Sequence, residues 1–151
     1  AVAKYLKLTN QQIARGIAAL TPVEHRLQLL QSAGGVTVID DAFNTNPRSA
    51  KKALDVLKAF PGRRIVVTPG MVELGNEEFG HYMAGCVDIA VLVGKKHTAP
   101  IEKGLLDGGF KKENIHVVSS LDEAIQLNQT MLKPGDVVMY ENDLPDHYSE
   151  G

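Results

Sequence analysis

A cluster of polar side chains follows directly after the apolar run VTVI. It puts five such residues into the seven positions from 40 to 46, namely Asp40, Asp41, Asn44, Thr45 and Asn46. Carboxylates accept hydrogen bonds from ligand hydroxyls. Asn46 and Pro47 predict the start of a helix, whose positive dipole end attracts anions. The segment therefore predicts a site for a ligand with hydroxyl and phosphate groups, although Asp and Asn also occupy such loops simply to bond nearby backbone amides.

A candidate phosphate contact lies 15 residues before this cluster, in the pair His25-Arg26. The segment HRLQLLQ, the turn-forming residues 32–35 and VTVID predict a β-hairpin with Arg26 on its first strand. Such a hairpin would fold Arg26 back beside Asp41, where a guanidinium suits phosphate oxygens. An arginine that keeps a sheet edge soluble is the alternative interpretation, and the role of His25 is open.

Two further loops carry residues that could meet a ligand. Glu73 lies in the glycine-containing loop TPGMVELG, and Asn142, Asp143 and His147 lie in the terminal segment YENDLPDHY. The glycines also serve loop conformation, and a solvated tail accounts equally well for the terminal segment. The histidines and the single cysteine lack metal-ligand spacing, so no metal site is predicted.

Alternating strands and helices must position these loops. Short apolar strands at 65–68, 88–93, 115–118 and 136–141 alternate with helices expected at 47–60, 77–86, 98–107 and 120–132. The pattern predicts an α/β fold, a Rossmann-like doubly wound and mostly parallel sheet with an amino-terminal β-hairpin. Ligands of such sheets bind beyond the carboxyl ends of the strands, which selects loops 40–46, 69–76, 94–97 and 141–148.

Composition narrows the class of function. The 151 residues fit one domain with a short extension, and a net charge of −2 provides no basic field for nucleic acids. No apolar run approaches the roughly 18 residues of a membrane span. A single cysteine agrees with a reducing compartment, so we expect a cytoplasmic protein without nucleic-acid or membrane partners.

The run from His25-Arg26 through the hairpin into DDAFNTNP, and then PGRRIVVTPGMVELG, resembles the carboxy-terminal domain of Mur ligases. The resemblance is nearest to the branch that adds D-alanyl-D-alanine, whose members typically read DDSYNANP and then GDMxELG in the same order. It covers essentially the whole chain. Residues 1–20 resemble the end of a central ATPase domain, and residues 21–151 resemble the carboxy-terminal domain.

The resemblance implies an enzyme of peptidoglycan precursor synthesis. Such a ligase uses ATP and Mg²⁺ to activate a UDP-N-acetylmuramoyl peptide as an acyl phosphate, which an amino acid or D-alanyl-D-alanine then attacks. Arg26 matches the arginine that reaches the ATP phosphates, and Asp41 matches the aspartate that contacts the ribose. The neighbouring residues assigned to ATP are His25, Asp40 and Asn44. Those assigned to the amino substrate are Thr45, Asn46, Glu73, Asn142, Asp143 and His147.

Two departures leave the second substrate open. Phe43 stands where the family usually has tyrosine, and ENDLPDHY stands where the D-alanyl-D-alanine branch has Lys-Gly-Ser. The sequence also contains no G-x-x-x-x-G-K-[ST] phosphate loop. The resemblance therefore places ATP and Mg²⁺ mainly on a preceding central domain, itself preceded by a UDP-sugar-binding domain, and predicts that this chain acts as a lid that is inactive alone. The alternatives are a stand-alone, non-catalytic nucleotide- or amino-acid-binding module and a folylpolyglutamate-type ligase domain.

Overall fold

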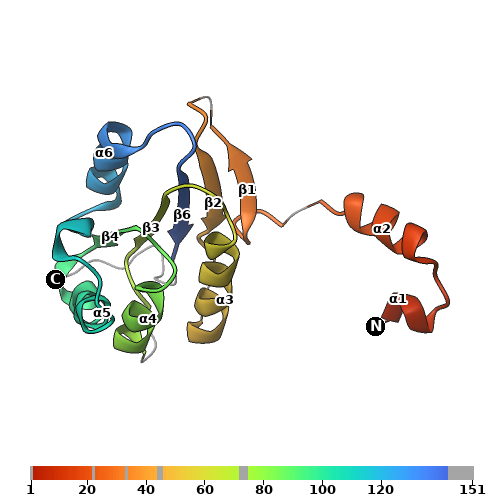
Figure 1. Ribbon diagram of the computed structural model, residues 1–151, viewed down its shortest axis with the longest axis horizontal. Coiled ribbons are helices and arrows are strands. Elements are labelled where there is room, and N and C mark those ends of the chain that lie inside the picture. Colours follow the sequence, from red (N-terminus) through yellow and green to blue (C-terminus); the bar gives the residue numbers. More distant parts are fainter. Residues whose placement is uncertain (1, 22, 33, 44–45, 72–74, 143–151) are drawn as a thin grey trace.

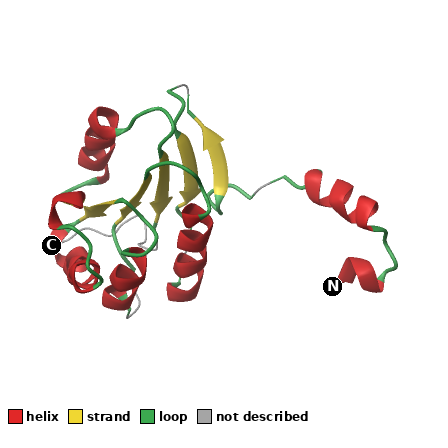
Figure 2. Cartoon of the chain, in the orientation of Figure 1, coloured by secondary structure: helices red, strands yellow, loops and turns green. Residues whose placement is uncertain are grey.

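The computed structural model describes residues 2–21, 23–32, 34–43, 46–71 and 75–142. Helices and strands alternate from the hairpin onward (Figure 2). The helices are α1 (Val2–Tyr5), α2 (Asn10–Ala18), α3 (Pro47–Lys58), α4 (Asn76–Met83), α5 (Lys95–Asp107), the short 3₁₀ helix η1 (Lys112–Asn114) and α6 (Leu121–Met131). The strands are β1 (Gln28–Gln31), β2 (Thr37–Asp41), β3 (Arg64–Thr68), β4 (Ile89–Val93), β5 (Ile115–Val118) and β6 (Val137–Glu141).

The six strands form one sheet in the order β1-β2-β6-β3-β4-β5. Only the β1–β2 hairpin pairs antiparallel, whereas β2, β6, β3, β4 and β5 run parallel. The last strand, β6, therefore inserts between β2 and β3, which are consecutive in the parallel part of the sequence. This confirms the predicted mostly parallel sheet with an amino-terminal hairpin, and it brings the carboxyl ends of β2, β6 and β3 together at one edge.

Helices cover both faces of the sheet, and each face has its own core (Figure 1). On one face, α3, α4 and α5 bury residues such as Leu54, Phe79 and Ile101 against the sheet. On the other face, α6 buries Ala124 against Val91 and its neighbours. Because both faces are covered, the inner strands are continuously apolar instead of alternating, as the sequence pattern indicated.

Helices α4 and α5 pack with their backbones unusually close. A Cβ placed on Gly104 would lie 2.0 Å from the Glu77 carbonyl oxygen, and one on Gly80 would lie 2.1 Å from the Ile101 carbonyl oxygen. Real Cβ contacts are essentially never that short. The two glycines thus permit a helix crossing that no other residue type would allow.

Several expected boundaries differ from the structure by up to three residues, and two of these differences concern the candidate site. Helix α5 begins at Lys95, so most of the expected loop 94–97 is its first turn. Gly94, at φ +84°, turns the chain directly after β4, and the helix accommodates Pro100 in its interior. Strand β1 begins at Gln28, so Arg26 lies in the turn before the strand and not on it.

The amino-terminal helices α1 and α2 extend away from the sheet (Figure 1). A capping box formed by Thr9 and Gln12 starts α2. Neither helix contains a buried residue, and the apolar side chains of Ile17 and Leu20 are 64% and 72% exposed. Among the described helices, none is long and apolar enough to cross a membrane.

Candidate functional site

The carboxyl edge of the sheet brings together polar residues that are far apart in the sequence. Asp41 at the end of β2 is the register partner of Glu141 at the end of β6. Thr68 ends β3 on the other side of β6, and its hydroxyl donates a hydrogen bond of 2.7 Å to the Glu141 carboxylate. The predicted ligand edge thus contains two carboxylates and a hydroxyl, all of them buried.

Asp41 is a buried carboxylate with a specific backbone partner. Its side chain accepts a 3.0 Å hydrogen bond from the backbone N–H of Leu27, and the residue is only 8% exposed. Burial raises the pKa of Asp41, and the charge of Asp40 raises it further, whereas the Leu27 bond and the Arg26 charge lower it; the net pKa is raised. The fold therefore keeps a carboxylate at this edge in surroundings that penalise its charge.

Asp40 points away from Asp41 and binds His25. Successive strand residues face opposite sides of a sheet. The Asp40 carboxylate lies 2.8 Å from His25 Nδ1, and its other oxygen accepts a 3.2 Å hydrogen bond from the backbone N–H of Ala42. The hairpin therefore brings His25 next to Asp40. It also brings Arg26 next to the loop that follows β2.

Arg26 lies at the same edge, with its guanidinium carbon 4.7 Å from the centre of the Phe43 ring. This is a cation–π contact, which aromatic rings other than tyrosine also provide. The residues on either side of Arg26, His25 and Leu27, have φ of +58° and +47°. This left-handed conformation costs about 1–2 kcal/mol for a residue with a side chain. The backbone around Arg26 is strained.

The start of α3 faces this edge and is capped as predicted. The side-chain amide oxygen (Oδ1) of Asn46 accepts hydrogen bonds from the backbone N–H groups of Arg48 and Ser49. For Asn46, the local interpretation of the polar cluster therefore holds. Asn142, which follows β6, is partly buried at the same edge. Five other predicted site residues lie outside the described residues, namely Asn44, Thr45, Glu73, Asp143 and His147.

The pair Thr68–Glu141 was not among the residues predicted from the sequence. Thr68 also accepts a 3.1 Å hydrogen bond from the backbone N–H of Gly70, which connects β6 to the loop after β3. That loop is further held by Asn76, whose side chain bonds both the N–H and the carbonyl of Met71. The sequence does show a polar residue, Thr68, at the end of an apolar strand. Its partner Glu141 could not be predicted, because the pairing depends on the insertion of β6 between β2 and β3.

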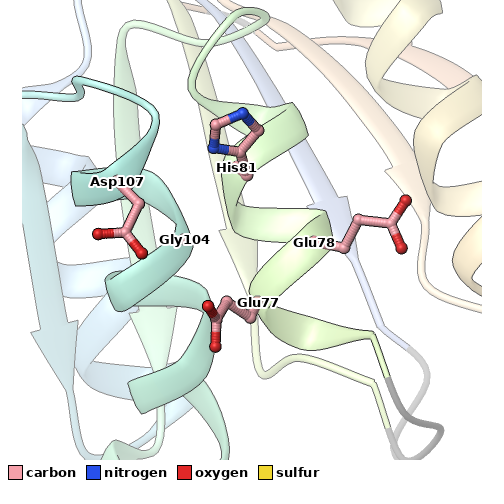
Figure 3. A pocket seen from close by; sticks show the side chains of 5 residues that line it. All are labelled: Glu77, Glu78, His81, Gly104 and Asp107. Atoms are coloured by element: carbon pink, nitrogen blue, oxygen red, sulfur yellow. The ribbon is translucent and has the colours of Figure 1, made fainter.

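A surface hollow of about 390 Å³ lies elsewhere, between α4 and α5, lined by Glu77, Glu78, His81, Gly104 and Asp107 (Figure 3). Its acidic groups are already paired. Lys103 bridges Glu77 and Asp107, and Lys51 binds Glu78. Among the residues that the structure describes, no group of three or more His, Cys, Asp or Glu could hold a metal ion. The hollow therefore adds nothing to the carboxyl edge as a candidate site.

Comparisons with known sequences match one family model and two kinds of related ligase. A family model described as "Mur ligase, glutamate ligase domain" matches residues 25–140. The UDP-N-acetylmuramoyl-tripeptide–D-alanyl-D-alanine ligase of Mycobacterium leprae (strain TN) is 31% identical over 85% of this chain. The UDP-N-acetylmuramoylalanine–D-glutamate ligase of Pelotomaculum thermopropionicum is 28% identical over 92% of the chain. The alignments cover only 29% and 30% of those two relatives.

The fold has a solved counterpart. A structure of MurF ligase from Thermotoga maritima in complex with ADP superposes with a TM-score of 0.69 at 24% identity, covering 93% of this chain and 32% of that one. At this level of sequence identity, the structural similarity shows a shared fold and no more than that. The chain spans about a third of the length of the proteins it matches.

Proposed function

Because this chain belongs to the Mur ligase family, we propose that it is the carboxy-terminal lid domain of an ATP-dependent, amide-forming ligase of peptidoglycan precursor synthesis. In that reaction a muropeptide carboxylate oxygen attacks the γ-phosphorus of ATP and ADP leaves. The amine of an amino acid or of D-alanyl-D-alanine then attacks the acyl phosphate, phosphate leaves, and an amide forms. The domain contributes nucleotide contacts and closes the site.

The juxtaposition of Arg26 and Asp41 supports this proposal most strongly. The backbone N–H of Leu27, next to Arg26, donates a hydrogen bond to Asp41, so a cation and a carboxylate lie close together at the carboxyl edge. The guanidinium offers a fork of donors to phosphate oxygens, and the carboxylate can accept ribose hydroxyls. The Leu27 N–H occupies only one of the lone-pair positions of Asp41. A nucleotide-binding site uses both kinds of group, a cation for the phosphates and a hydrogen-bond acceptor for the ribose hydroxyls.

We assign the remaining ATP contacts to a preceding domain. The sequence contains no phosphate loop, and the described residues offer no cluster that fits Mg²⁺. In this proposal Mg²⁺ and the triphosphate are held by the central domain, and the present chain closes over them and excludes water. The same division of roles makes the chain inactive by itself.

The amine substrate is assigned to the segment after β6. Asn142 lies at the carboxyl edge, and the neighbouring Asp143 and His147 are proposed to join it in binding the amine. The two relatives named above carry different amines in their names, D-alanyl-D-alanine and D-glutamate. Their names are those of muropeptide ligases, which favours a muropeptide over a folate as the other substrate.

The decisive experiment removes the guanidinium. In the complete enzyme, Arg26→Ala should lower ATP-dependent ligation by well over tenfold, because loss of a charge-assisted hydrogen bond typically costs about 1.5–3 kcal/mol. Phosphate release is measured with the UDP-N-acetylmuramoyl peptide and a panel of amines comprising D-alanyl-D-alanine and single amino acids. Arg26→Lys keeps the charge but loses the fork, so we expect an intermediate rate.

Lys111→Ala serves as the control, because Lys111 is an exposed cation whose ion-pair partner is the exposed Glu113. Its ligation rate should equal that of the wild type. An unchanged rate for Arg26→Ala would remove Arg26 from the site. If no amine supports phosphate release but the protein still binds ATP, a non-catalytic nucleotide-binding module becomes the better description.

A further inference from the structure

The two neighbouring aspartates hold the residues on either side of Arg26. Because they are consecutive in β2, Asp40 and Asp41 leave the strand toward opposite faces of the sheet. Asp40 binds His25 Nδ1 at 2.8 Å, and Asp41 accepts the N–H of Leu27 at 3.0 Å. Arg26 thus lies between two anchored neighbours, and each anchor comes from a different carboxylate.

The backbone that these contacts hold is one that side chains disfavour. His25 and Leu27 are both left-handed, at φ +58° and +47°, and such residues persist only where the surroundings determine them. One local contact assists, since the Gln28 side chain accepts a 3.3 Å hydrogen bond from the N–H of His25. The conformation on both sides of Arg26 therefore depends on partners about 15 positions away in the sequence.

Both carboxylate oxygens of Asp40 have partners inside the protein. One binds His25, the other accepts the N–H of Ala42, and the side chain is only 17% exposed. These two contacts fix the hairpin turn and leave Asp40 fewer free lone pairs for a ligand than Asp41 retains. Asp40 also stands on the sheet face opposite the one that Asp41 uses.

From this geometry we propose that Asp40 and His25 are positioning residues, which act on the nucleotide only through Arg26. The inference rests on the proposed function, in which Arg26 contacts the ATP phosphates. The paired aspartates of VIDDAFNTNP then have separate tasks: Asp41 anchors Leu27 and faces the ligand, whereas Asp40 holds the turn. Holding a cation in place before the ligand arrives strengthens binding, because less conformational freedom is lost.

The test is a double-mutant cycle on ATP binding by the complete enzyme, measured by calorimetry. Asp40→Ala should weaken ATP binding about tenfold, but should change it less than twofold when Arg26 is already alanine. Asp40→Asn keeps an oxygen for Ala42 and a polar group for His25, so ATP affinity should return to within about threefold of the wild type. Folding of each variant is verified by circular dichroism.

The matched control is Asp107→Ala, which removes the exposed ion pair with Lys103 on α5 and should leave ATP affinity unchanged. Equal losses for Asp40→Asn and Asp40→Ala would overturn the inference, because they would point to a role of the charge itself. A further loss in the Arg26→Ala background would also overturn it. ATP binding that depends on Arg26 but not on Asp40 defeats this inference alone, whereas a wild-type enzyme that binds no ATP defeats the proposed function as well.

Discussion

At the scale of single residues, the proposed ligand contact and the burial of Asp41 have opposite effects on its ionised form. A ligand hydroxyl is bound best by an ionised carboxylate, yet burial of Asp41 raises its pKa and makes the ionised form costly. The Leu27 N–H and the Arg26 charge offset part of this cost but not all of it. Residues that lower stability in this way are expected where function, and not folding, determines the side chain.

Asp41→Asn should therefore stabilise the chain at neutral pH while weakening the proposed nucleotide contact. The amide oxygen can still accept the Leu27 N–H, and the penalty for a buried charge disappears. Because the folded pKa of Asp41 is raised, its favourable contribution is complete below the unfolded pKa of about 3.9 and is lost as the pH rises through the folded pKa. We expect a gain of about 0.5–2 kcal/mol at pH 7, which shrinks toward pH 4.

Thermal unfolding of wild type and variant at several pH values measures this difference. Glu24→Gln, at an exposed position outside the helices, is the control and should change little. A variant that is less stable than the wild type at pH 7 would mean that Arg26 and Leu27 fully compensate the buried charge.

At the scale of secondary-structure elements, α4 and α5 belong to the helix layer on one face of the sheet and cross each other closely. Gly80 and Gly104 let the two helix backbones approach within a distance that any Cβ would prevent. Helix α4 follows the loop that Thr68 and Asn76 hold, so its position also determines where that loop lies. Packing within the helix layer is thus coupled to the carboxyl edge.

Gly104→Ala should be strongly destabilising. The new Cβ would lie 2.0 Å from the Glu77 carbonyl oxygen and 2.8 Å from the His81 backbone nitrogen, so the helices would have to separate. We expect a loss of roughly 3 kcal/mol, the upper part of the usual range for overpacking. Chemical denaturation measures the free energy of unfolding.

Gly85→Ala is the matched control, because its Cβ would meet nothing nearer than the Tyr82 carbonyl oxygen at 3.7 Å. That variant should differ from the wild type by no more than about 0.5 kcal/mol. Equal stability of the two alanine variants would contradict the assigned close approach.

At the scale of the whole molecule, the sheet domain buries two cores of its own, whereas α1 and α2 bury nothing. The apolar side chains of Ile13 and Ile17 on α2, and of Leu20 two residues after it, share one side of this segment, and none of them is buried. This arrangement suits the proposal that residues 1–20 belong to a preceding ATPase domain. Apolar side chains at helical spacing normally indicate a buried face.

Ile17→Lys should consequently have different effects in two contexts. In the 151-residue chain, where Ile17 is 64% exposed, the unfolding temperature should not change. In the complete protein the substitution should lower it by several degrees, since a charge would be buried at the domain contact. Gln11→Lys, on the exposed opposite side of α2, should be neutral in both. Equal behaviour of Ile17→Lys in both contexts would argue against the domain assignment.

Much of the fold followed from local patterns. Asn46 caps the helix for which it was predicted, and the apolar runs became strands of a mostly parallel sheet. These features depend on residues within a few positions of one another, so the sequence expresses them directly. The boundaries were less exact, because α5 begins at Lys95, three residues before the expected 98, and α4 ends at Met83, three residues before the expected 86.

For the candidate site, the sequence by itself pointed to Arg26 and Asp41 as candidates and predicted the hairpin that brings them close together. It could not determine that β6 lies between β2 and β3, which places Glu141 beside Asp41 and Thr68. Nor could it show that Asp40 binds His25. Strand order and side-chain pairing across strands depend on contacts between distant segments, and those contacts exist only once the two cores have packed.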